Sequence, residues 1–528
     1  MSTGRYVRLK SLDTIAASHL PPSSAGRSRV SSSLNFIRTL ASSPRHAAVV
    51  VGTVIVIGLV VMLQGRTGGK AYELAWSGGR FGPARSYAKE VLQHQLKDVL
   101  PQASWKDQLQ PSSKYLTAMM FGGQSNQLLA MYNLLYMGKE LARTVILPPF
   151  TAIHFKGQQR TFHQIYDVPR FYSLTGVPAI PLGYFKSPSD PSSVRDDVTC
   201  WSTMELYTGS CNNHQVETGF NAHNIYTSFW AMPHFPRSSD GAVIQFGPLL
   251  DFLRNRTARL DWVEETKREV LPQRPLRKDV DPLTVDKEKN LKAFFEPLHG
   301  VPPTADEQLM CVDAAFYVGY SVPPPPYPQH IPLEPWRGRA WQEIGQHLHW
   351  IPEVAQVADE YLARIFGVKR IDDVPPYISV HIRRGDFKNF KGNTAYTPLK
   401  NYAAAVNSVR ERLQDRLEFP LSVEEREGKP ALRRFKTMPA EYAVLVTSDE
   451  DGESDLWAEV DAMGWKTINH GDLKTVETYG EWWPSMLDGE MLSRGQGFVG
   501  TQWSTFSMVS GLRVEYWQGG IQVVADPK

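Results

Sequence analysis

The chain has 528 residues, of which 42% are hydrophobic and 21% are charged, with 57 Lys and Arg against 55 Asp and Glu. This composition excludes a chain that is disordered throughout, and the length predicts two or three domain-sized units. Residues 1–46 hold seven basic residues and one acid, so the rest of the chain carries a slight acidic excess. No nucleic-acid partner is therefore expected, because such binding needs a basic face.

Residues 47–63 read AAVVVGTVIVIGLVVML and contain no charge. A helix of this length spans roughly 25 Å, enough to cross a thin bilayer. The long tail before it and the lack of a small-residue cleavage site distinguish it from a cleaved signal peptide. The basic tail predicts a single-pass type II protein with the body of the chain in the lumen. The short span suits a thin bilayer, which favours the Golgi or ER membrane. We thus predict a disordered cytosolic tail over 1–46, a transmembrane anchor over 47–63 and a stem over 64–111.

An N-terminal domain is predicted over residues 112–335. A strand over 114–121 ends at Gly122 and Gly123, and a helix over 126–143 leads into a second strand, which stops at a proline pair. This order of elements is typical of the start of a parallel α/β domain.

Residues 186–300 have mixed charge and predict irregular insertions. They contain a glycosylation sequon at Asn255. Three cysteines are too few for a disulfide scaffold. A local disulfide between Cys200 and Cys211 would leave Cys311 free, and the alternative is that Cys200 and Cys211 do not pair.

A second domain is predicted over residues 336–528, after a proline-rich stretch. Its helix over 354–365 shows apolar residues at helical spacing and ends at a glycine. Short apolar strands then alternate with polar loops and helices, which predicts a second parallel, Rossmann-like domain. The predicted strands cover residues 377–382, 442–447 and 497–501.

The strand over 377–382 holds His381 near its end and leads into Arg383 and Arg384, at the point where ligands bind in open parallel sheets. Fixed cations there suit a pyrophosphate leaving group, which gains negative charge as a glycosidic bond breaks. The alternative is a surface arginine pair bridging to acids.

Three segments together resemble the GDP-fucose protein O-fucosyltransferase family. They are HIRRGD, a motif shared with α1,6-fucosyltransferases, FGGQSNQLLAMYNLLYMGKELARTVILPPF and GFVGTQWSTFSMV. The resemblance implies a GT-B fold, in which two Rossmann-like domains face a cleft. It also implies metal-independent transfer of fucose, with inversion, from GDP-fucose to a protein Ser or Thr hydroxyl.

The resemblance also implies roles for individual residues. Arg383 would bind the β-phosphate and assist the departure of GDP, and Asn126 would face the transfer site. His381 would lie against the nucleotide, and Asp449 would contact the guanine. The other residues implied in binding GDP-fucose are Gly122, Gly123, Ser504, Thr505 and Phe506. For Ser504 and Thr505 the residue types themselves support this role, because hydroxyls and free backbone N–H groups at a helix start can bind an anion.

The general base is not identified by the sequence. Some relatives place a glutamate in the N-terminal glycine loop, where this chain has Gln124 and Ser125. Asp386 and Asp167 are the candidates, and the alternative for each is a structural carboxylate.

Other functions stay open at this stage. Asp449-Glu450-Asp451 has the D-x-D form with which metal-dependent GT-A enzymes hold a nucleotide sugar. A fucosyltransferase that acts on a glycan would share the arginine motif. A membrane-tethered sugar-nucleotide-binding protein with a decayed site is the non-catalytic alternative.

Overall fold

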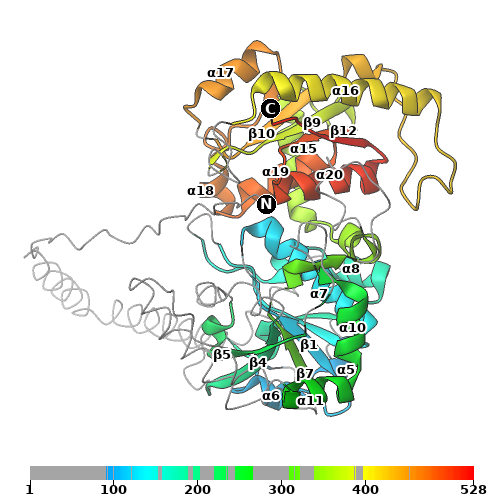
Figure 1. The fold of residues 1–528 in the computed structure, drawn as a ribbon. Helices are drawn as coiled ribbons and strands as arrows, with labels where there is room; N and C mark the ends of the chain where they lie inside the picture. The colour runs from blue at the N-terminus through cyan, green and yellow to red at the C-terminus, as the bar shows by residue number, and fades with distance from the viewer. Residues whose placement is uncertain are drawn as a thin grey trace, which may run out of the picture. The chain divides into compact units, whose positions relative to one another are not determined.

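The computed structural model describes residues 91–527, which lie in one compact unit, Phe81–Lys528 (Figure 1). Gaps in the description are residues 92, 99, 121, 153–156, 188–193, 203–218, 234, 236–243, 266–307, 314, 321–337, 386, 388–395 and 451. The predicted tail, the anchor at 47–63 and the first part of the stem lie outside the described residues. Among the helices that are described, none is long and apolar enough to span a bilayer.

The N-terminal half is built on a six-stranded sheet in which all neighbouring strands are parallel. Its strands are, in spatial order, β3 (Ala179–Pro181), β2 (Thr144–Leu147), β1 (Tyr115–Ala118), β7 (Leu309–Val312), β4 (Asp196–Ser202) and β5 (Ile225–Ala231). β6 (Ile244–Gln245) and β8 (Val318–Tyr320) form a separate pair. The helices of this half are α5 (Gln93–Gln95), α6 (Trp105–Gln108), α7 (Gln124–Glu140), α8 (Val168–Thr175), α10 (Phe246–Arg254), α11 (Arg256–Glu265) and α14 (Arg339–Glu343). The predicted strand-helix-strand start is confirmed, since α7 connects parallel β1 and β2.

β4 and β5 correct the prediction of irregular insertions over residues 186–300. The two strands pair along their whole length, and β4 also pairs with β7 near the middle of the sheet. β4 begins with two aspartates, which read as a loop in the sequence. Asp196 is nevertheless buried, because Lys186 forms an ion pair with it.

Cys200 on β4 lies opposite Cys311 on β7, and the two cysteines form a disulfide. Both are buried, and their Cα atoms are 4.3 Å apart. The considered Cys200–Cys211 bond is therefore wrong, and Cys211 itself lies outside the described residues. The true partners are 111 residues apart in sequence, so only the pairing of their strands brings them together.

The last part of the predicted stem packs against the N-terminal sheet. Trp105 is fully buried and its backbone N–H donates to Asp196 Oδ2 at 3.1 Å. Tyr115 Oη donates to the Gln95 carbonyl at 2.5 Å. Residues 93–110 are thus held by the folded body through side chains on β1 and β4.

The C-terminal half contains a five-stranded parallel sheet. Its strands are, in spatial order, β11 (Lys466–Thr467), β10 (Ala443–Ser448), β9 (Tyr377–Ile382), β12 (Gly497–Gly500) and β13 (Ile521–Val524). The helices of this half are α15 (Pro352–Phe366), α16 (Leu399–Glu418), α17 (Asp455–Ala462), α18 (Thr475–Tyr479), α19 (Trp483–Ser493) and α20 (Thr505–Gln518). If β9 to β13 are counted as strands 1 to 5, their spatial order is 3-2-1-4-5, which is the order of a Rossmann fold. The prediction of an α/β protein with two parallel sheets is confirmed.

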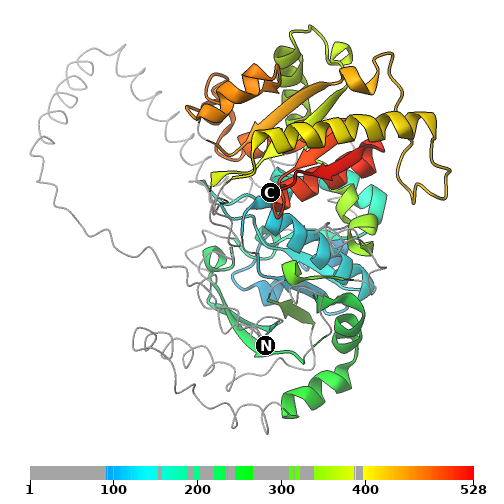
Figure 2. The same cartoon turned by 45° about the horizontal axis from the view of Figure 1, so that its top comes forward.

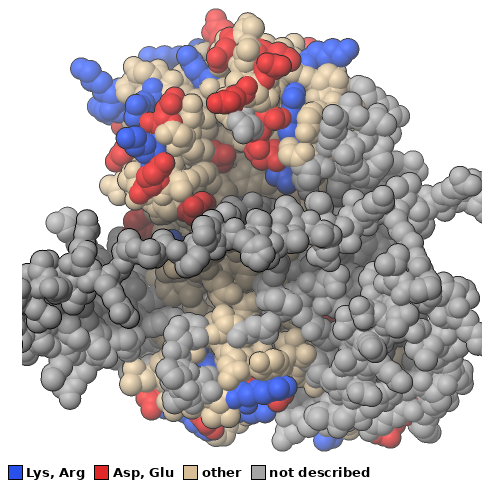
Figure 3. Space-filling model, turned by 90° about the vertical axis from the view of Figure 1, so that its left-hand side faces the viewer, with Lys and Arg blue, Asp and Glu red and all other residues tan. Residues whose placement is uncertain are grey.

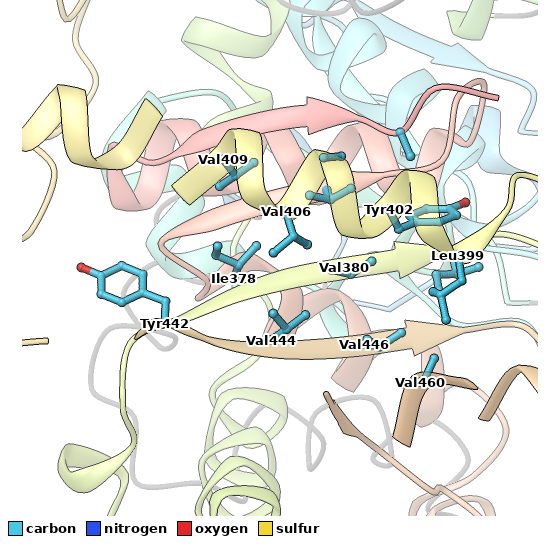
Figure 4. Close-up of a cluster of buried hydrophobic side chains, with 14 of the residues drawn as sticks. Ile378, Val380, Leu399, Tyr402, Val406, Val409, Tyr442, Val444, Val446 and Val460 are labelled. Atoms are coloured by element: carbon cyan, nitrogen blue, oxygen red, sulfur yellow. The ribbon is translucent and has the colours of Figure 1, made fainter. Parts of the chain in front are cut away.

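The core of the C-terminal half lies between α16, which crosses the sheet in Figure 2, and the strands of that sheet (Figure 4). Apolar residues of α16, among them Val406 and Val409, face Ile378 and Val380 of β9 and their neighbours on β10. Burial of each such side chain contributes about 1.5–3 kcal/mol. This packing holds β9 and β10 side by side and so fixes where the loops at their carboxyl ends emerge.

One face of this half carries charges of both signs (Figure 3). On the face shown in Figure 3, Lys and Arg are interspersed with Asp and Glu over the part of the surface that is described.

Candidate active site

The strand order of the C-terminal sheet places a candidate site at the ends of β9 and β12. In a parallel sheet, ligands bind at the carboxyl edge where the strand order reverses. That reversal lies between β9 and β12, which are neighbours although β10 and β11 intervene in the chain. Residues 383–385 leave the end of β9, and residues 501–504 leave the end of β12.

Thr501 joins these two loops. Its Oγ1 donates to the His381 carbonyl at 3.0 Å and accepts the Arg383 N–H at 2.8 Å. Tyr402 Oη lies 2.7 Å from Thr501 Oγ1 as well. Neither Thr501 nor Tyr402 is among the site residues predicted from the sequence. Thr501 ends the predicted strand over 497–501, which is a usable signal, whereas Tyr402 lies within α16 with no local pattern to mark it.

His381 lies at the end of β9 with its side chain buried. Its Nδ1 is 2.7 Å from Ser507 Oγ, which accepts the Thr501 N–H at 3.0 Å. The centroid of the Phe506 ring is 4.8 Å from that of the His381 ring. Burial, helped by the nearby Arg383 charge, lowers the pKa of His381 to about 3. The imidazole is therefore neutral at physiological pH.

We expect thermal stability to fall on acidification. Burial lowers the pKa of His163 to about 4. Burial, together with nearby cations, lowers the pKa of both His349 and His381 to about 3. Because the unfolded chain binds these protons at a pKa near 6.5, stability is full above that pH and is lost as the pH falls toward 3. At pH 5 the loss is up to about 2 kcal/mol per histidine. Unfolding temperatures at pH 7.5 and 5.0 check this, and His381→Gln should reduce the difference. A pH-independent unfolding temperature would contradict it.

Two ion pairs connect the loop after β9 with the loop after β10. Arg383 Nη1 lies 2.7 Å from Asp449 Oδ2, and Arg384 Nε lies 3.6 Å from Glu450 Oε2. The Arg384 N–H also donates to Asp449 Oδ1 at 2.7 Å. This geometry is compatible with both interpretations of the sequence, a surface arginine pair that bridges to acids and a cationic site for a pyrophosphate. The two acidic side chains orient the arginines at the carboxyl edge of the sheet.

Ser504 and its neighbours begin α20. Ser504 is the N-cap, and its Oγ accepts the Ser507 N–H at 3.2 Å. Thr505 Oγ1 donates to Asn126 Oδ1 of the N-terminal half at 2.7 Å. This bond brings together two predicted site residues that are 379 positions apart in the chain.

The glycine loop places Asn126 for this contact. Gly122 has φ of +77°, and a Cβ at this position would overlap the Asn126 side chain. Gly123 is the N-cap of α7, and its carbonyl accepts the Gln127 N–H at 3.0 Å. Gln127 Nε2 donates to the Gly122 carbonyl and to the Thr151 carbonyl, both at 2.8 Å. Gly122 is thus required both for the turn and for the approach of Asn126.

The candidates for the general base differ in where they lie. Asp167 is the N-cap of α8, and its Oδ1 accepts the Arg170 N–H at 3.1 Å, which is a structural use of the carboxylate. Asp386 lies outside the described residues. In the glycine loop, Gln124 Oε1 accepts a hydrogen bond from Ser485 of α19 at 2.7 Å. Gln124 therefore connects the two halves of the body.

Asp449 and Glu450, the start of the possible metal motif, each lie against an arginine. Asp451 lies outside the described residues. In the part of the chain that the structure describes, no three His, Cys, Asp or Glu side chains gather as a metal site would require.

The family model for GDP-fucose protein O-fucosyltransferases matches residues 115–516, well over half of the chain. The chain belongs to this family. The resemblance seen in the three sequence segments is thereby confirmed, and the chain is a glycosyltransferase of the fucosyltransferase type. No curated protein sequence matches it.

Solved structures of fucosyltransferases are also similar. POFUT1 in complex with GDP-fucose has 13% identity and a TM-score of 0.40, covering 79% of this chain and 99% of that one. The fucosyltransferase NodZ from Bradyrhizobium has 11% identity and a TM-score of 0.32, covering 76% and 92%.

Proposed function

We propose that this chain transfers fucose from GDP-fucose to a Ser or Thr hydroxyl of a protein, with inversion and without a metal. Its two parallel sheets would act as the two halves of a GT-B enzyme. Membership in the O-fucosyltransferase family supports the donor and the class of acceptor.

The Thr505–Asn126 hydrogen bond is the observation that carries this proposal. It joins α20 of the C-terminal half, which begins just after β12, to the residue that follows the glycine loop of the N-terminal half. In this arrangement Arg383 would stabilise the β-phosphate as GDP departs, and the start of α20 would bind pyrophosphate oxygens. His381 would contribute a neutral ring against the nucleotide. Asn126 would orient the acceptor hydroxyl.

We also propose that the chain is a type II protein of the Golgi or ER membrane and that its catalytic part lies in the lumen. The uncharged stretch at 47–63 and the basic tail before it support the topology. The buried Cys200–Cys311 disulfide supports an oxidising compartment.

Thermal shift of the full-length protein in detergent tests the donor assignment. We expect stabilisation by GDP and GDP-fucose, and the stabilisation should survive EDTA. A ligand at 100 times its dissociation constant stabilises the fold by about 2.7 kcal/mol. A shift only with a UDP-sugar and Mn²⁺ would contradict the proposal in favour of a metal-dependent enzyme.

Two further outcomes concern the chemistry. GDP binding without release of GDP from GDP-fucose would favour a decayed site. Transfer to an oligosaccharide but to no protein would favour a glycan acceptor.

A further inference from the structure

Asp449 uses both carboxylate oxygens to bind the loop that carries Arg383. Oδ2 lies 2.7 Å from Arg383 Nη1, and Oδ1 accepts the Arg384 N–H at 2.7 Å. The approach depends on a glycine, because a Cβ at Gly385 would overlap Oδ2. Gly385 also has φ of +36°, in the region that favours glycine. The carboxylate is thus fitted closely to this loop.

Arg383 is held from both neighbouring strands. Its backbone N–H donates to Thr501 Oγ1 after β12, and its guanidinium pairs with Asp449 after β10. Arg383 and Asp449 side chains are each 24% exposed, so the pair lines an accessible surface. A guanidinium carries five N–H donors and can bind a carboxylate and a phosphate at once.

We propose that Asp449 is a positioning residue for Arg383, and that it does not act as the contact that selects guanine. The inference rests on the proposed function, in which Arg383 binds the β-phosphate of the donor. Asp449 would hold the guanidinium at the carboxyl edge before the donor arrives, so that less side-chain freedom is lost on binding. The cost of losing Asp449 should then fall on the β-phosphate and spare the base.

Asp449→Asn separates the two roles, because the amide oxygen can still accept the Arg384 N–H while the negative charge is lost. Dissociation constants of GDP and GMP for the full-length protein are measured by calorimetry. We expect GDP binding to weaken about tenfold, as for loss of a charge-assisted contact, with GMP binding unchanged because GMP lacks the β-phosphate. Equal weakening of GDP and GMP would overturn the inference in favour of a guanine contact. Unchanged or tighter GDP binding would overturn it as well.

A double-mutant cycle gives a second, independent readout. In an Arg383→Ala background, Asp449→Asn should leave GDP affinity unchanged, since the residue through which it acts is gone. Additive losses would overturn the inference. Asp372→Asn is the matched control, because Asp372 pairs with Arg370 at 2.6 Å before the opposite, amino end of β9. Its ratio of GDP to GMP affinity should equal that of the wild type.

Wild-type binding distinguishes the two levels of failure. If the wild-type protein does not bind GDP, the proposed function fails. If it binds GDP and Asp449→Asn leaves the ratio of GDP to GMP affinity unchanged, the positioning role alone fails.

Discussion

Arg383→Ala should lower the rate of GDP release from GDP-fucose by about 10²- to 10³-fold. Negative charge grows on the β-phosphate as the glycosidic bond breaks, and the substitution removes the cation that would face it. The fold should survive, because the lost ion pair with Asp449 is partly exposed and such pairs contribute less than about 1 kcal/mol. GDP formation followed by chromatography measures the rate, and the unfolding temperature monitors the fold.

The control for this experiment is Arg370→Ala, which also removes an arginine paired with an aspartate, but before the amino end of β9. It should release GDP at the wild-type rate. Near-wild-type turnover of Arg383→Ala would contradict the role of Arg383 at the leaving group.

Lys186→Ala should destabilise the protein by about 3–5 kcal/mol. The Lys186 side chain is fully buried, and its Nζ lies 2.8 Å from Asp196 Oδ2. Asp196 also accepts hydrogen bonds from Ser104 Oγ and the Trp105 N–H, so this one carboxylate ties residues 104–105 to the start of β4. The substitution leaves a buried carboxylate without its cation and opens a cavity beside it.

Unfolding temperatures of the two variants at one scan rate provide the comparison. Lys139→Ala is the matched control. Lys139 Nζ lies 2.7 Å from Glu343 Oε2, close to the 2.8 Å of the buried pair, but the Lys139 and Glu343 side chains are 41% and 34% exposed. Its loss should be below about 1 kcal/mol. Similar shifts for both variants would contradict the importance of the buried pair.

Much of the donor-side half could be predicted from the sequence. β9, β10 and β12 are short apolar runs because parallel strands are buried on both faces, and each is followed by polar residues where the sheet edge meets solvent. That pattern located His381 and Arg383 at a strand end and Ser504 at the helix start that follows another strand. The motif resemblance then identified the family, which the family model confirms.

The N-terminal half was less predictable, because its strands depend on distant contacts. β4 begins with Asp196, whose burial requires Lys186, and β7 lies next to β1 although β2 to β6 come between them in the chain. The partner of Cys200 follows from the pairing of β4 with β7 and from no spacing in the chain.

By itself, the sequence determined the α/β class, the motifs and the residue types available for a sugar nucleotide. Local patterns carry this information, since the burial and turn preferences of each segment are properties of neighbouring residues. The tertiary structure decided which of these residues meet: Asp449 with Arg383, and Thr505 with Asn126. Such pairs form where strand order brings strand ends together and where the two halves touch, and both depend on the packing of the whole core.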